Sequence, residues 1–219
     1  MKYLHGARLR RVACATVVLG STLAVLAPQA ANATVVTTTE KGTTACTIPG
    51  LFSGNLALKT KTTYDNGPIA VGASESASVK ASVTVPEALN QAAWNTLDAR
   101  SYKGTVTHSW VDNNLATPSP YDATSNNTIV IAPTNLPTGG NASSKLKFKI
   151  PNGGPFTATG SGTDNAVAGD PTNGFATANV TYYSKANEGG HVITTLTATC
   201  NTPVATGSGP FVIATITIS

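Results

Sequence analysis

The sequence predicts an all-β protein, a sandwich or a barrel, with one short helix. The chain is rich in Thr, Val, Ala, Ser and Gly and poor in Glu, Lys, Leu and Met, a balance that favours strands over helices. Apolar and polar residues alternate in several segments, as half-buried strands require. Clusters of Gly, Pro, Asn and Asp separate these segments, which indicates turns.

Four segments carry the strand prediction. In 79–85 the small apolar residues share one face, and in 145–150 three lysines alternate with three apolar side chains. We interpret this basic stripe as a solvated face rather than a binding site, because alternation with a core-facing set accounts for it. Alternate residues of 192–200 share one face that ends at a cysteine, whereas 211–218 is apolar on both faces and predicts a central strand.

Residues 86–97 predict the one helix. Pro86 suits the first helical position, and Leu89, Ala93 and Leu97 recur every four residues. We expect this face to pack, together with Trp94, over one end of the sheets.

The first 33 residues have the order of a secretory signal peptide. Four basic residues precede an apolar run over 12–26, and Ala31-Asn32-Ala33 follows as a small-residue cleavage site. The run is shorter than the roughly 20 residues of a spanning helix, so we expect cleavage rather than anchoring. A single domain over 34–219 would then be secreted, extracellular or associated with the cell wall. Arg10-Arg11 leaves the twin-arginine route open beside the favoured general secretory route.

Removal of residues 1–33 changes the charge balance. Four of the 14 Lys and Arg residues lie in that segment and all ten acidic residues follow it, so 34–219 carries ten of each and is formally neutral. A neutral chain without a basic cluster calls for neither nucleic acid nor an anionic membrane as partner. We expect no stable membrane insertion after cleavage.

Two cysteines remain in 34–219, and we predict a disulfide between Cys46 and Cys200 because thiols tend to pair in an oxidising compartment. Two buried free thiols are the alternative. The bridge would contribute on the order of 3 to 5 kcal/mol on the chain-entropy model.

Catalytic, metal and cofactor motifs are missing from the sequence. There is no Gly-x-Ser-x-Gly pentapeptide, and neither His108 nor His191 stands in a metal-ligand motif. Glu87, Asp98 and Asp112 could form a carboxylate pair for glycoside hydrolysis, but no motif places them. We therefore expect no enzyme, no catalytic residue, no metal and no cofactor.

Aromatic residues are the one candidate ligand platform, because sandwiches that bind sugars expose Trp or Tyr side chains. Core packing is the favoured role for most of them. The platform candidates are Trp94, Tyr102, Trp110, Tyr121, Tyr182 and Tyr183.

Several segments resemble a family of secreted actinobacterial domains of unknown function. They are 44–50 (TACTIPG), 83–86 (VTVP), 103–106 (KGTV), 154–160 (GPFTATG), 197–200 (TATC) and 212–218 (VIATITI). The resemblance spans nearly all of 34–219. It implies an exported Gram-positive protein with an immunoglobulin-like β-sandwich, and it carries over no catalytic or ligand residue.

These observations predict a class of protein but no specific ligand. We expect a secreted, non-enzymatic β-sandwich module with a structural or interaction role at the cell envelope or outside the cell. Its partner would be a cell-wall glycan or an envelope protein. A carbohydrate-binding module is the alternative, which requires at least two of the named aromatics exposed together, and a glycan hydrolase is the third.

Overall fold

A computed structural model describes residues 34–108, 110–112, 128–157, 162–169 and 174–219 of the protein. Within these ranges the side chains of 74–76, 110–112, 150–157 and 164 are not described. The predicted signal peptide, 1–33, lies outside the described residues. The described chain is all-β with one short helix, and its antiparallel sheets form a sandwich or barrel-like arrangement, which confirms the predicted fold class.

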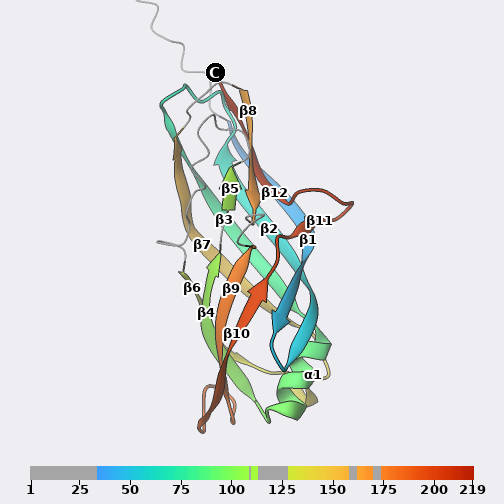
Figure 1. Ribbon diagram of the computed structural model, residues 1–219. Helices are drawn as coiled ribbons and strands as arrows, with labels where there is room; N and C mark the ends of the chain where they lie inside the picture. Colours follow the sequence, from blue (N-terminus) through green and yellow to red (C-terminus); the bar gives the residue numbers. More distant parts are fainter. Residues whose placement is uncertain (1–33, 109, 113–127, 158–161, 170–173) are drawn as a thin grey trace, which may run out of the picture. The chain divides into compact units, whose positions relative to one another are not determined.

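The larger sheet has nine strands, and its main path falls into two halves of four strands each (Figure 1). The first half runs in the order β1, β2, β3, β7, and its bounds are Val35–Ile48, Phe52–Asp65, Ser74–Val85 and Ser144–Thr157. The second half runs in the order β6, β4, β9, β10, and its bounds are Thr128–Asn135, Ser101–His108, Ala176–Tyr183 and Val192–Cys200. The short β11, Val204–Ala205, pairs with β1 off this path.

The two halves meet where β10 lies beside β1. This junction, here called the seam, has only two register pairs, Cys46 with Cys200 and Thr47 with Thr199. By contrast β1 pairs with β2 from Val35 to Ile48 without interruption. Few backbone hydrogen bonds therefore join β1 to β10, compared with the other neighbouring pairs on the main path of the larger sheet, and β11 adds two further register pairs with β1.

The smaller sheet has the order β12, β8, β5, with bounds Val212–Ile218, Gly162–Ala168 and Trp110–Asp112. The prediction of a central strand at 211–218 is wrong, because β12 is an edge strand of this sheet in the described part of the chain. Apart from its pairing with β8, the described residues give it one isolated bridge, between Ile218 and Ile69. Its two apolar faces have another cause: the register of β12 with β8 shifts between Val212 and Ala214, so Ile213 and Ala214 are both buried.

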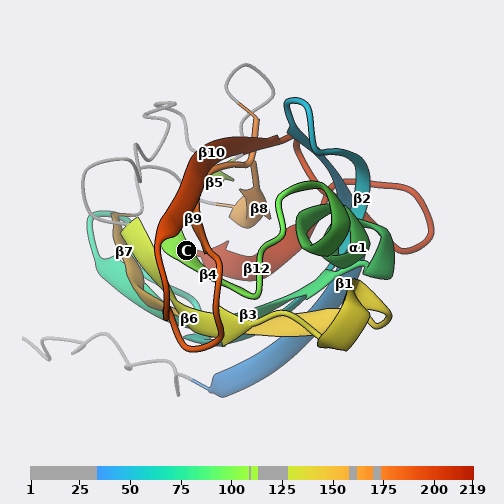
Figure 2. The same ribbon diagram turned by 90° about the horizontal axis from the view of Figure 1, so that it is seen from below.

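The buried side chains of β12 and β8 pack against the larger sheet. Phe211, Ile213 and Ile216 share a core cluster with Leu58 of β2 and Val79 of β3. Viewed along the strands, the larger sheet curves around β12 (Figure 2). The alternation of apolar and polar residues that predicted half-buried strands thus gives the larger sheet one continuous apolar inner face.

Helix α1, Glu87–Thr96, lies within one residue of the predicted bounds at each end. Pro86 is the N-cap, in extended backbone, and not the first helical residue as predicted; its missing N–H is no loss there, because the first N–H groups of a helix have no intrahelical partner. Leu89 and Ala93 are buried, so the predicted apolar face does pack against the sheet. A 3-10 turn over Thr138–Gly140, labelled η2, touches the other side of the helix. A Cβ at Gly140 would lie 2.6 Å from the Cα of Gln91, so only glycine fits.

Candidate functional site

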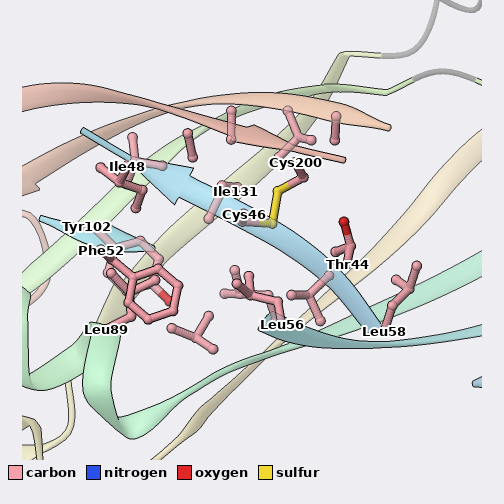
Figure 3. Close-up of a pocket in the computed structure, with 18 of the residues that line it drawn as sticks. Thr44, Cys46, Ile48, Phe52, Leu56, Leu58, Leu89, Tyr102, Ile131 and Cys200 are labelled. Carbon is pink, nitrogen blue, oxygen red and sulfur yellow. A yellow bond between two sulfur atoms is a disulfide. The ribbon is translucent and has the colours of Figure 1, made fainter. Parts of the chain in front are cut away.

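A cavity of about 140 Å³ lies on the inner side of the larger sheet. All eight strands of the sheet's main path line it, together with α1. The lining is almost wholly aliphatic or aromatic. Figure 3 shows Leu56 and Leu58 of β2, Ile131 of β6 and Leu89 of α1 around the space.

Small side chains leave this space open. Ala178 of β9 and Ala198 of β10 lie directly opposite each other in register, and both face the cavity. Directly opposed side chains on a sheet are close neighbours, so two alanines leave a gap that two larger residues would fill. The cavity therefore follows from the pairing of β9 with β10, and sequence reasoning alone did not identify it.

The predicted disulfide is confirmed and forms part of the cavity wall. Cys46 of β1 and Cys200 of β10 are bonded across the seam, and both line the space (Figure 3). The bridge thus joins the two halves of the larger sheet at the place where backbone pairing is shortest. No signal in either cysteine's local sequence indicated this role at a cavity.

Asn90 lines the cavity and has an unused hydrogen-bond acceptor that its neighbours cover. Its side chain is 1% exposed, and its Nδ2 donates to the carbonyl of Ala142 at 2.8 Å and to Oγ of Ser144 at 3.2 Å. Its Oδ1 accepts no hydrogen bond from the described residues. Thr44, another polar lining residue, is satisfied because its Oγ1 donates to the carbonyl of Asn201 at 2.6 Å.

Three of the predicted platform tyrosines are buried, so the platform prediction is wrong for them. The exposed fractions of Tyr102, Tyr182 and Tyr183 are 5%, 4% and 8%. Tyr102 and Tyr182 face the cavity with ring centroids 6.0 Å apart, and burial raises the pKa of both hydroxyls. These rings are inside because β4 and β9 are inner strands of the curved sheet, and their register places both side chains on its concave face.

The remaining platform candidates do not form an exposed pair in the described part of the chain. Trp94 is half-buried, and the guanidinium of Arg100 lies 3.9 Å from its ring centroid, which covers one aromatic face. Trp110 belongs to β5 but its side chain is not described, and Tyr121 lies outside the described residues.

The other residues that sequence analysis considered for catalysis are dispersed. Asp98 forms an ion pair with Arg100, and Glu87 accepts a hydrogen bond from Gln91 at 2.9 Å. The side chain of Asp112 is not described. His108 is buried at the cavity, whereas His191 lies in the exposed turn region between β9 and β10. Among the residues placed in the structure, no three His, Cys, Asp or Glu side chains gather as a metal site.

No described helix has both the length and the apolar character to cross a membrane. No protein-family model matches the chain, no curated protein is significantly similar in sequence, and no solved structure is significantly similar in fold. The resemblance to secreted actinobacterial domains therefore stays a prediction.

Proposed function

We propose that this chain is an exported, non-enzymatic β-sandwich module that binds a small apolar molecule inside its larger sheet. The observation that carries the proposal is the cavity of about 140 Å³. An engineered apolar cavity of about 150 Å³ in another protein stays dry and binds benzene. The signal-peptide pattern of 1–33 and the Cys46–Cys200 bridge support export to an oxidising compartment.

An empty cavity of this size carries a stability cost. At about 24 cal/mol per Å³, a volume of about 140 Å³ corresponds to roughly 3 kcal/mol of lost packing. A ligand that restores those contacts would return part of this free energy to the folded state. Binding fits the lining better than catalysis, because no carboxylate and no free thiol faces the cavity among the described residues.

Asn90 narrows the chemistry of the ligand. Its Oδ1 is an acceptor that the described residues leave unused, whereas most of the other lining residues are apolar. A ligand with an apolar body and one hydroxyl group would satisfy both features. Phenol should therefore bind about five-fold more tightly than toluene, because one neutral hydrogen bond contributes about 1 kcal/mol.

The test is a cavity-filling variant measured by thermal denaturation with and without phenol. In Ala198→Leu the added side chain occupies the cavity, so phenol should no longer raise the melting temperature. Thr199→Gln is the matched control, because residue 199 is the next position on β10 and is exposed on the opposite face. Equal stabilisation of Ala198→Leu and the wild type by phenol would contradict the proposal. If phenol stabilises the wild type and Thr199→Gln but not Ala198→Leu, mass spectrometry of the native protein would identify any natural ligand that copurifies.

A further inference from the structure

Seven lysines gather on the outer face of the first half of the larger sheet. All seven are exposed, and they lie on four neighbouring strands, β1, β2, β3 and β7. This set, here called the basic face, consists of Lys41, Lys59, Lys61, Lys80, Lys145, Lys147 and Lys149. The expectation that the chain has no basic cluster is wrong, because strand pairing brings together lysines from four separate segments.

Register makes the basic face a lattice of like charges. Lys41 lies opposite Lys59, and Lys80 lies between Lys61 and Lys149 as the direct partner of both. Neighbours across strands are about 4.8 Å apart at the backbone, and alternate residues along a strand are about 6.7 Å apart. Directly opposed like charges destabilise a sheet, so the clustered lysines lower the stability of the fold. Lysines spaced apart on a solvated face would not have this unfavourable effect.

Acidic side chains do not neutralise the basic face. None of the seven lysines makes an ion pair with the residues placed in the structure. Among the acidic residues of these strands whose side chains are described, Glu40 lies at an inward register position and Asp65 ends β2, four residues beyond Lys61; the side chain of Glu75 of β3 is not described. The formal neutrality of 34–219 therefore conceals a strong separation of charge.

We propose that the basic face binds a linear phosphodiester polymer that carries no bases, such as a polyol phosphate. All seven cations are lysines, and a lysine ammonium binds phosphate as a point charge without requiring one fixed geometry. Most of the described outer positions between them are occupied by Thr, Ser and Asn, whose hydroxyl and amide groups suit a hydroxyl-bearing chain, and the others are small Ala residues. A flexible chain with a phosphate at each repeat can follow a curved face, along which its charges meet successive lysines.

Two other polyanionic surfaces fit the basic face less well. Single-stranded nucleic acids are held by aromatic side chains that stack on the bases, and the described outer positions of these strands present none. An anionic bilayer is planar, whereas the larger sheet curves (Figure 2), so a bilayer would reach only part of the basic face. Both surfaces serve as alternatives in the experiment.

The experiment measures binding of a synthetic poly(glycerol phosphate) to the secreted form of the chain by calorimetry over a range of salt concentrations. If five of the seven lysines contact phosphates, affinity should fall about 100-fold between 50 and 200 mM salt. Lys80→Gln should weaken binding about five-fold at 100 mM salt, because one phosphate contact is lost. Lys185→Gln is the matched control, since Lys185 is exposed on the turn after β9 and removes the same charge. It should leave the affinity unchanged.

Comparison polymers make the proposal refutable. Polygalacturonate, oligothymidylate and vesicles of phosphatidylglycerol should each bind more weakly than poly(glycerol phosphate). Equal or tighter binding to any of them would overturn the proposal, and so would no binding at low salt or equal losses in Lys80→Gln and Lys185→Gln. Because Lys80 is exposed and faces two other lysines, its replacement should not lower the melting temperature, which verifies folding. The outcome is independent of whether the cavity binds phenol.

Discussion

Loss of the Cys46–Cys200 bridge should weaken the fold far more than loss of an ordinary surface contact. The bridge closes a loop with a sequence separation of 154 residues. On the chain-entropy model a loop of this length corresponds to about 5 kcal/mol, the upper end of what one disulfide contributes. The seam offers little compensation, because β1 and β10 share only two register pairs.

The assay is urea denaturation of the wild type and of Cys46→Ala/Cys200→Ala, followed by tryptophan fluorescence. We expect the double variant to lose about 3 to 5 kcal/mol of unfolding free energy. Its denaturant dependence should also become steeper, because an unlinked unfolded chain exposes more surface. Reduction of the wild type, which keeps both sulfur atoms in the cavity wall, separates the effect of the crosslink from that of lost packing.

A loss below about 1 kcal/mol in both the variant and the reduced wild type would refute this reasoning. It would mean that the unfolded chain stays compact without the bridge, or that the core between the sheets alone keeps the halves together. The reducing agent should not affect the double variant, which serves as the control.

Three further changes test particular packing statements. Thr62→Val should raise the free energy of unfolding by about 1 kcal/mol in urea denaturation, because Thr62 is 1% exposed and its Oγ1 has no partner among the described residues. Thr63→Val, on the outer face, is the control and should not raise the free energy of unfolding. Gly140→Ala should cost more than Gly72→Ala in melting temperature, because both glycines have positive φ but only the added Cβ at 140 would meet the backbone of α1. The free energy of unfolding should fall above pH 10, because burial raises the pKa of Tyr182 and the native state keeps a proton that the unfolded chain releases. In Tyr182→Phe this fall should be less steep by up to about 1.4 kcal/mol per pH unit. If urea titrations at several pH values give the same pH dependence of the unfolding free energy for the variant and the wild type, the prediction is contradicted.

The local structure could be predicted well because period-two alternation and helix signals act over a few residues. The helix bounds and the inward face of 79–85 follow from such patterns. The face of 192–200 was predicted only in part, since the register shifts between Val192 and Thr194 and leaves Val192 on the exposed side. A bulge of this kind depends on the partner strand, which one segment does not specify.

The candidate sites could not be predicted because they depend on which strands become neighbours. Thr-rich strands can pair in several orders with similar local energy, so the sequence alone does not place Ala178 opposite Ala198. The same holds for the basic face. Lys80 and Lys149 are far apart in the chain, and only the pairing of β3 with β7 makes them neighbours.

The seam also has a consequence for the order of folding. Its strands β1 and β10 are separated by 154 residues at the cysteines, whereas β1 and β2 are joined by a short turn. Closing a long loop costs more chain entropy than closing a short one, so we expect hairpins such as β1–β2 to form early and the seam to form late. Until then the inner face of the larger sheet is open along one side. An apolar molecule present during folding would enter a half-built interior, whereas one added to the oxidised native protein meets a crosslinked wall.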